Sequence, residues 1–196
     1  MYLNEALYTD FLNDREILWL GIDFSKARFT KKDFNITQEV LRYYLNEWNL
    51  LIISDQKKYD IRLSFRKPVM SYDLSLISKC NKTVKINNIL HENITLNDLQ
   101  SEESICNYVR SLEMPQQHRF ALMFIVESFD TNSKTGSVWV VVTETSSKEP
   151  VLCEKFIKNP SGFGVKNYWA RIFYNVLFDI KSYAFCRWEN LVKKSE

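Results

Sequence analysis

The sequence predicts an α+β fold, in which a mainly antiparallel sheet with a C-terminal three-strand meander is packed by two or three helices. Two observations support this prediction. Residues 119–157 contain three apolar runs separated by polar turns, which is typical of antiparallel strands. Residues 37–54 and 166–180 repeat apolar side chains three and four apart, as expected for helices that cover a sheet.

The predicted meander comprises residues 119–129, 137–145 and 151–157. Its middle run is rich in valine and contains no glycine or proline, as expected for a strand that is covered on at least one face. A polar segment that ends at Gly136 separates the first two runs, and one that ends at Pro150 separates the last two. We expect each segment to be the turn of an antiparallel hairpin.

Nearer the N-terminus, residues 16–24 alternate in the manner of a strand. The alternation places one set of side chains on one face (Leu18, Leu20, Ile22 and Phe24) and a second set on the other (Trp19, Gly21 and Asp23). An aspartate in an apolar strand has two interpretations. Asp23 is either a carboxylate of a functional site or a structural residue that is exposed or hydrogen-bonded.

Helices are predicted at residues 37–54 and 101–112. Thr37 is suited to cap the first helix, whose expected buried stripe is Val40, Leu41, Tyr44, Leu45, Trp48 and Ile52. The second helix turns Ile105, Val109 and Leu112 inward and ends before Pro115. Residues 59–65 fit an edge strand or one helical turn, and residues 84–90 fit a short strand.

A last helix is predicted from Lys166 onward. Its apolar stripe is Trp169, Ile172, Phe173, Val176, Leu177 and Ile180, and its water-facing side is Arg171, Asn175 and Asp179. The loop before it, residues 159–164, holds Gly162 and Gly164, which we expect to adopt positive φ angles. We expect Phe163, between the two glycines, to pack beneath the helix as a hydrophobic staple does.

This loop is also a candidate ligand site, because a helix N-terminus presents free N–H groups and a positive dipole end to an anion. The candidate binding residues are Gly162, Gly164, Lys166 and Asn167. The loop lacks the third glycine of the dinucleotide fingerprint and the Gly-Lys-Ser/Thr ending of a P-loop. Only about thirty residues follow it, so no second parallel strand completes a βαβ unit.

The composition indicates a single globular domain that spans residues 1–196, because four glycines and four prolines leave little room for linkers. The 26 basic residues are interspersed with 24 acidic ones, which argues against nucleic-acid binding. The longest apolar run, Phe120 to Val126, is too short to span a membrane. Polar residues within the first twelve positions do not fit a signal peptide.

The residues that carry chemistry match no known catalytic pattern. The chain has two histidines and four widely spaced cysteines (Cys80, Cys106, Cys153 and Cys186), so we predict no metal site and no cofactor, and expect the cysteines to be buried free thiols. No catalytic residue is predicted. Glu127, at the end of an apolar strand, is either a strand-end charge in water or the partner of Lys166 or Asp23.

Four stretches of the chain carry a family resemblance. They are residues 19–25 (Trp-Leu-Gly-Ile-Asp-Phe-Ser) with 27–29, residues 48–49 (Trp-Asn), residues 124–128 (Phe-Ile-Val-Glu-Ser), and residues 162–164 with 167–170. With them the chain resembles a family of small proteins from Bacteroides-type bacteria that usually carry a secretion signal and have no assigned activity. The chain departs from the family pattern at Ser161, at Lys166 and at residues 141–143. The resemblance implies an α+β fold and a periplasmic or other extracytoplasmic location; a native start at Met1 would instead indicate the cytoplasm.

The sequence therefore favours a non-catalytic binding or interaction module of the bacterial cell envelope. Its expected partner is a protein or a small ligand, with no nucleic acid and no membrane span. The alternative is a small-ligand-binding protein or an enzyme that uses Asp23, Glu127 and the loop Ser161 to Gly164 at a helix N-terminus.

Overall fold

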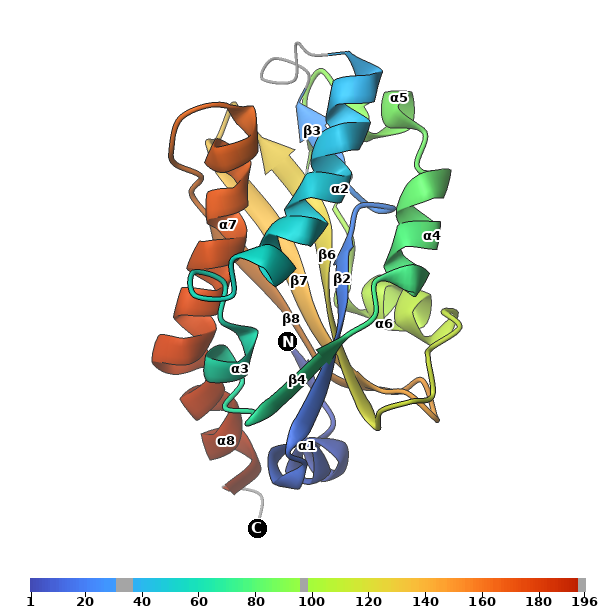
Figure 1. Ribbon diagram of the computed structural model, residues 1–196, viewed down its shortest axis with the longest axis vertical. Helices are drawn as coiled ribbons and strands as arrows, with labels where there is room; N and C mark the ends of the chain where they lie inside the picture. The colour runs from blue at the N-terminus through green and yellow to red at the C-terminus, as the bar shows by residue number, and fades with distance from the viewer. Residues whose placement is uncertain (31–36, 96–98, 194–196) are drawn as a thin grey trace.

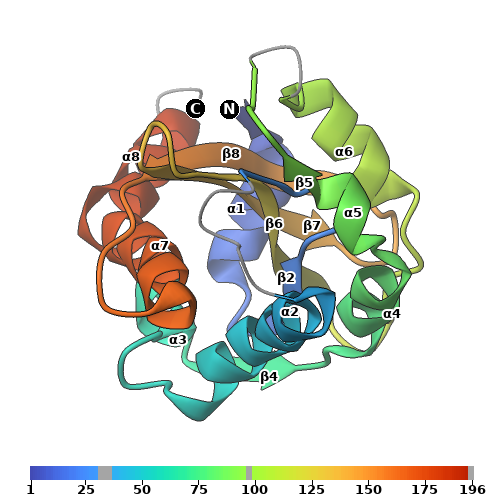
Figure 2. The same ribbon diagram turned by 90° about the horizontal axis from the view of Figure 1, so that it is seen from above.

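The computed structural model describes residues 1–30, 37–95 and 99–193. These residues form one sheet with helices against both faces, which confirms the α+β class (Figures 1 and 2). The strand order is β1-β8-β7-β6-β2-β4, and β3 and β5 join the sheet off this path through β6.

The strands are β1 (Tyr2–Leu3), β2 (Glu16–Asp23), β3 (Arg28–Thr30), β4 (Val69–Tyr72), β5 (Leu90–His91), β6 (Phe120–Asp130), β7 (Thr135–Glu144) and β8 (Pro150–Lys158). The helices are α1 (Glu5–Asn13), α2 (Gln38–Ser54), α3 (Ile61–Ser64), α4 (Ser75–Thr83), α5 (Ile86–Ile89), α6 (Glu102–Arg110), α7 (Val165–Asp179) and α8 (Phe185–Lys193). A short π-helical stretch, η3 (Ile180–Ala184), joins the last two helices.

The predicted meander is confirmed as β6, β7 and β8, which pair in antiparallel fashion along most of their lengths. β1 extends it with a further antiparallel pairing on β8. The N-terminal half of the chain joins the same sheet in parallel, because β2 runs beside β6 and β4, and β3 runs beside β6 and β5. The sequence patterns gave no indication of these parallel pairings.

β2 departs from the strict alternation that its sequence predicts. A register shift against β6 lies between Trp19 and Gly21, where Gly21 has φ of +118°. Leu18 and Leu20 therefore face one core, whereas Ile22 and Phe24 face the other. The prediction that these four residues share a face is wrong, because a bulge flips the strand by one position.

The sheet separates two apolar cores. The larger lies under α1, α2, α7 and α8 and includes four completely buried tryptophans (Trp19, Trp48, Trp169 and Trp188). The smaller lies under α4 and α6, on the opposite face. The predicted stripes of α6 and α7 are buried, and so is that of α2 except Val40, which is exposed, and Tyr44, which is half-buried.

Three local predictions are settled by the structure. Residues 61–64 form the helical turn α3, so the edge-strand alternative for residues 59–65 is wrong. Residues 86–89 form α5 and only Leu90 and His91 are extended, so the predicted strand at 84–90 is wrong. Asp179 does not face water, because it is buried in an ion pair with Lys158.

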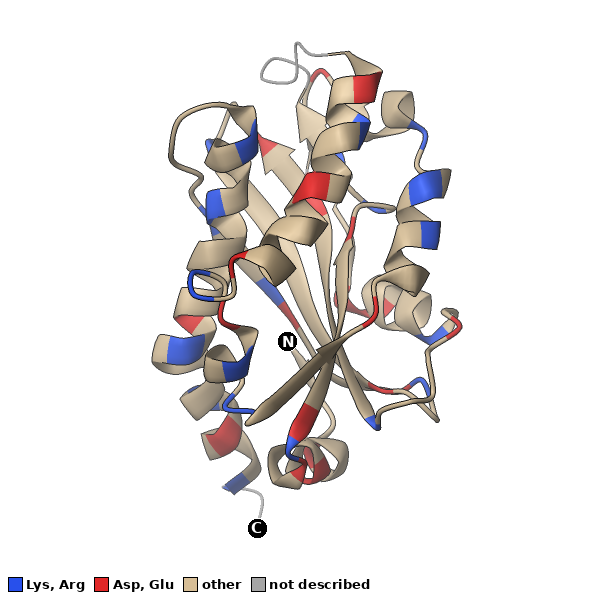
Figure 3. Cartoon of the chain, in the orientation of Figure 1, with Lys and Arg blue, Asp and Glu red and all other residues tan. Residues whose placement is uncertain are grey.

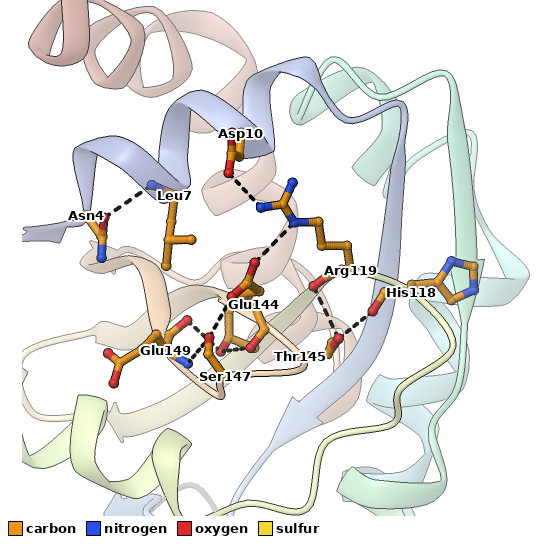
Figure 4. Close-up of polar contacts among 10 residues, drawn as sticks. Asn4, Leu7, Asp10, His118, Arg119, Glu144, Thr145, Ser147 and Glu149 are labelled. Atoms are coloured by element: carbon orange, nitrogen blue, oxygen red, sulfur yellow. Dashed lines mark hydrogen bonds and ion pairs between the residues drawn. The ribbon is translucent and has the colours of Figure 1, made fainter.

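The end of the sheet at which β6 begins is closed by paired charges (Figure 4). Arg119 Nη2 lies 2.6 Å from Asp10 Oδ2 of α1, and Arg119 Nε lies 3.1 Å from Glu144 Oε1 at the end of β7. Thr145 Oγ1 donates a hydrogen bond of 2.5 Å to the carbonyl of His118. These contacts tie α1 to the meander at this end of the sheet.

Candidate functional site

A cavity of about 490 Å³ lies beyond the carboxyl end of β2, a common position for ligand sites in sheets with parallel strands. Its wall is formed by residues 25–28, which connect β2 to β3, by residues 83–85, by Asn88 and Ile89 of α5, and by Gln100. Its volume falls within the range of ligand pockets, which is roughly 300–1,000 Å³.

Among the residues that the structure describes, the charged ones that line this cavity are all basic. They are Lys26, Arg28 and Lys85. Figure 3 shows further Lys or Arg residues along α4. Ala27, Val84 and Ile89 supply an apolar part of the wall. The cavity therefore combines convergent positive charge with an apolar surface.

Two asparagines fix the backbone that leads into the cavity wall. β4 ends beside Trp19, so the last residues of β2 have no neighbouring strand on that edge. Asn49 of α2 accepts from Ile22 N (2.6 Å) and donates to Ile22 O (2.9 Å), and Asn81 of α4 donates to Ile22 O (2.8 Å) and accepts from Phe24 N (2.8 Å). The side-chain amides thus satisfy backbone groups that would otherwise be buried without partners.

Gly21 is required for this arrangement. A Cβ at this position would lie 2.6 Å from Asn49 Oδ1, and φ of +118° disfavours any L side chain. On α2, Trp48 donates from Nε1 to the carbonyl of Lys166 at 2.9 Å, which ties α2 to the first turn of α7. Direct contacts therefore join the motif stretch at residues 19–25 to the one at 48–49, and β2 pairs the first of these with residues 124–128.

Asp23 supports the cavity wall from behind and is completely buried. Its Oδ1 accepts from Ser25 N at 2.7 Å and its Oδ2 accepts from the Tyr108 hydroxyl at 2.5 Å, while Ser25 Oγ donates to that hydroxyl at 3.0 Å. Burial raises the pKa of Asp23, an effect partly offset by these hydrogen bonds and by the charge of Lys26. Asp23 is therefore hydrogen-bonded, as its structural interpretation requires, and its use in a functional site stays a prediction.

This cluster contacts one of the three cations, and β5 contacts a second. The Lys26 ammonium lies 4.6 Å from the centre of the Tyr108 ring, a cation–π contact. Arg28 Nη1 lies 3.3 Å from His91 Nε2 on β5. Burial, followed by the charge of Asp23, raises the pKa of Tyr108, so the phenol stays protonated and keeps donating to Asp23.

Glu127 is also buried, with 1% of its surface exposed, but it has more partners. Oε1 accepts from Gln100 N (2.9 Å), Lys155 Nζ (2.9 Å) and Trp139 Nε1 (3.2 Å), and Oε2 accepts from Ser137 Oγ (2.6 Å). The predicted pairing of Glu127 with Lys166 or Asp23 is wrong, because Lys155 of β8 lies nearer on the same face. Through Gln100, Glu127 anchors another part of the cavity wall.

The glycine loop lies on the other side of the sheet. Gly162 and Gly164 have φ of +121° and +76°, as predicted, and Gly164 precedes α7. Phe163 is 95% exposed, so the prediction that it packs beneath the helix is wrong: the loop turns outward and leaves open space around Gly164. Lys166 pairs with Glu47 at 2.6 Å, which neutralises its charge.

The six predicted site residues therefore form two groups. Asp23 and Glu127 contact Tyr108 and Trp139, which pack with the smaller core. The other group comprises two glycines of the loop and two residues in the first turn of α7, which packs on the larger core (Gly162, Gly164, Lys166 and Asn167). The sheet lies between the two groups. The residues that line the basic cavity were not predicted; the available signal was Lys26 and Arg28 directly after a buried strand, but it becomes meaningful only once β2 is known to run parallel to its neighbours.

The cysteines are free and only partly fit the prediction. Cys106 and Cys153 are buried, Cys80 is half-buried, and Cys186 is exposed, so the expectation of burial is wrong for Cys186. Within residues 1–30, 37–95 and 99–193, no three histidine, cysteine, aspartate or glutamate side chains come together as a metal site. None of the helices in these ranges is long and apolar enough to cross a bilayer.

No family model matches the chain, and no curated protein matches it. Among solved structures, the chain is similar to the C-terminal domain of LpoB from Salmonella enterica (10% identity, TM-score 0.33, covering 79% of this chain and 94% of that one). It is also similar to lipoprotein GNA1162 from Neisseria meningitidis (9% identity, TM-score 0.34, 87% and 99%) and to the hypothetical protein CT253 from Chlamydia trachomatis (8% identity, TM-score 0.37, 86% and 96%). These values are too low to support an inference about function.

Proposed function

We propose that the protein is a non-catalytic binding module of the bacterial cell envelope, and that it binds its ligand or partner in the basic cavity beside α5. The observation that carries this proposal is the convergence of Lys26, Arg28 and Lys85 on one cavity of ligand size at the carboxyl end of a parallel strand. The argument for function is the position and lining of the cavity, because a fold class alone does not indicate a function.

Binding without chemistry is supported by the engagement of the two carboxylates. A general acid or base has to reach the proton that it transfers. Asp23 and Glu127 are buried, and both accept hydrogen bonds from groups of the protein itself. They hold the cavity wall in place and do not contribute to its lining surface.

The envelope location rests on the resemblance of the four motif stretches to a family of secreted proteins. Cys186 offers a direct test, because it is an exposed thiol. A membrane-impermeant maleimide should label the protein in cells whose outer membrane alone has been permeabilised, and the Cys186→Ser variant should lose most of this label. Labelling only after complete lysis would contradict an extracytoplasmic location.

The binding site can be tested by blocking the cavity. Asn88 and Asn87 are adjacent and exposed, but only Asn88 lines the cavity. Native mass spectrometry after incubation with a small-molecule extract of the producing cells should show a bound mass on the wild type and on Asn87→Trp. The same mass should be absent from Asn88→Trp, and its retention there would contradict the proposed site.

A second candidate, an enzyme that uses Asp23, is favoured by one observation. Ser25 lines the cavity, and its hydroxyl is linked through Tyr108 to Asp23, a carboxylate whose pKa is raised by burial. If this candidate holds, the mass bound from the extract should be converted to a product by the wild type and remain unconverted in Asp23→Asn. Persistence of the unchanged mass on the wild type supports the binding module.

A further inference from the structure

We infer that the outer edge of β4 is a second binding surface, and that it takes up an extended segment of a partner protein as an additional strand. The segment places one apolar side chain in a small pocket that is lined by Met70 and by residues between Gln56 and Arg62. This inference goes beyond the proposed function, because β4 runs beside the first half of β2 and the basic cavity lies beyond the other end of β2.

The outer edge of β4 presents backbone groups without partners. β4 pairs in parallel with β2, and the N–H groups of Val69 and Asp73 donate to carbonyls on that side. In a parallel ladder alternate residues point to the same side, so the N–H and C=O groups of Met70 and Tyr72 point away from β2. Within the part of the chain that the structure describes, no other strand pairs with β4 (Figures 1 and 2). These groups are available to the main chain of an added strand.

Apart from its short length and Pro68 just before it, this edge lacks the features that usually protect an exposed strand. Native proteins cover such edges, or place charged residues, prolines or bulges on them. β4 contains no charged residue and no proline, and its register with β2 is continuous. Val69 and Tyr72 are exposed. An edge of this kind favours pairing with another chain.

A small pocket beside the edge indicates where a side chain of the added segment lies. Its lining comprises Tyr59, Ile61 and Met70 and four polar residues that lie between α2 and β4 (Gln56, Lys57, Asp60 and Arg62). Its volume of about 200 Å³ is below the range of small-molecule pockets, which is roughly 300–1,000 Å³, and suits a single side chain. Side chains that face each other across two strands point to the same face, so a residue opposite Met70 is directed toward the pocket.

A partner segment fits this surface better than a second copy of the chain does. β4 offers the free backbone groups of Met70 and Tyr72, whereas stable dimer interfaces bury roughly 1,200 Å² of surface or more. Strand addition by a peptide relies on main-chain hydrogen bonds for affinity and on a side-chain pocket for specificity, and both are present here. The edge therefore fits an extended peptide with an apolar residue opposite Met70.

A library of random peptides displayed on phage supplies the probe, and peptides selected on the wild type are then tested on variants of Tyr72. Tyr72→Pro removes an outward N–H and places the proline ring at the edge, where proline is compatible with a strand because the donors to β2 remain. Tyr72→Thr removes the same side chain and keeps the N–H. The affinity of the selected peptides should fall by at least about tenfold in Tyr72→Pro, because a main-chain hydrogen bond is lost, and by less than about threefold in Tyr72→Thr.

Blocking the pocket tests its role separately. Gln56 and Ser54 are both exposed, but only Gln56 lines the pocket. Gln56→Trp fills the space of the anchored side chain and should weaken the peptides by at least about tenfold, whereas Ser54→Trp should weaken them less than about twofold. Asn88→Trp, which blocks the basic cavity, should leave their binding unchanged. A failure of this inference is thereby distinguished from a failure of the proposed function.

Hydrogen exchange of the wild type supplies a measurement that does not depend on the folding of a variant. In the free protein the amides of Met70 and Tyr72 should exchange faster than those of Val69 and Asp73, which donate to β2, and a bound peptide should slow them.

The inference is wrong if the selection yields no peptide that distinguishes Tyr72→Pro from Tyr72→Thr, or if a bound peptide leaves the exchange of Met70 and Tyr72 unchanged. Sedimentation of the wild type and both variants tests the other occupant. A wild-type dimer that Tyr72→Pro abolishes and Tyr72→Thr retains would assign the edge to a second copy of the chain and overturn the partner segment.

Discussion

Asp23 and Glu127 are two buried carboxylates on the same face and at the same end of the sheet, yet their surroundings differ. Glu127 accepts four hydrogen bonds, one of them from the Lys155 ammonium. Asp23 accepts from one backbone amide and one phenol, and its charge is compensated less directly, by Lys26. Burial alone therefore does not identify a functional carboxylate. The number and charge of its hydrogen-bond donors decide what each carboxylate does.

In this comparison the hydrogen bonds of Glu127 link β6, β7 and β8 to the chain at Gln100. Asp23 holds the loop from Ser25 to Arg28 in the conformation that forms the cavity wall. Each of these roles predicts a different response to substitution, so the two roles can be tested separately.

The largest effect is expected at Glu127. Glu127→Leu leaves the Lys155 ammonium and the buried donors of Ser137 and Trp139 without their acceptor, and breaking a buried pair in this way typically costs about 3–5 kcal/mol. Urea unfolding measures the loss. Glu127→Gln keeps an acceptor and should cost clearly less; equal losses for both variants would show that the charge is irrelevant and would weaken the comparison.

The next effect tests the backbone on which Asp23 depends. Gly21→Ala combines an unfavourable φ with a clash against Asn49, so the free energy of unfolding should fall by about 2–3 kcal/mol. Gly164→Ala is the matched control, because it shares a positive φ but has open space around the added methyl group, and it should cost about 1 kcal/mol. A smaller loss for Gly21→Ala than for Gly164→Ala would contradict the role given to Asn49.

These elements also show where sequence reasoning succeeds. Local patterns were sufficient for the meander and for α2, α6 and α7, because a helix stripe or a valine-rich strand is encoded by consecutive residues. The bulge at Gly21 and the parallel placement of β2 depend on pairing with residues about a hundred positions away. No periodicity within residues 16–24 contains that information.

In the candidate site, too, locally encoded features could be predicted and those that depend on distant residues could not. Asp23 and Glu127 were identified because a carboxylate in an apolar strand stands out locally, but their partners Tyr108 and Lys155 were not, since each comes from a distant element. Phe163 was misplaced because the sequence cannot show whether a loop turns toward the sheet or away from it. The basic cavity was missed because its cations come from two separate segments that only the fold brings together.

A third prediction compares one donor from each site. Tyr108→Phe removes one of the two donors of Asp23 and should cost about 1–3 kcal/mol, as expected when a buried charged acceptor loses a partner. Trp139→Phe removes the longest of four contacts to Glu127, at 3.2 Å, and should cost about 1 kcal/mol. Urea unfolding of both variants at one pH compares them directly, and a larger loss for Trp139→Phe would reverse our ranking of the two sites.

The smallest effect is a dependence on pH that separates Asp23 from an ordinary aspartate. Burial raises the pKa of Asp23, so its folded pKa lies above the unfolded value of about 3.9. Its favourable contribution is therefore present below about pH 3.9 and is lost as pH rises through the folded pKa. Relative to the wild type, Asp23→Asn should become more stable as pH is raised from about 4, by up to about 1.4 kcal/mol for each unit of pKa shift.

Asp73 supplies a control of opposite sign. Hydrogen bonds from Ser75 lower the pKa of Asp73, so its contribution is present above about pH 3.9 and is lost as pH falls through the folded pKa. Urea unfolding of both variants between pH 3 and 8 should therefore give differences from the wild type that change in opposite ways: Asp23→Asn gains on the wild type as pH rises, and Asp73→Asn gains on it as pH falls. A difference for Asp23→Asn that stays constant over this range would mean that the charge of Asp23 is compensated as fully as that of a surface carboxylate, and the contrast with Glu127 would then rest on geometry alone.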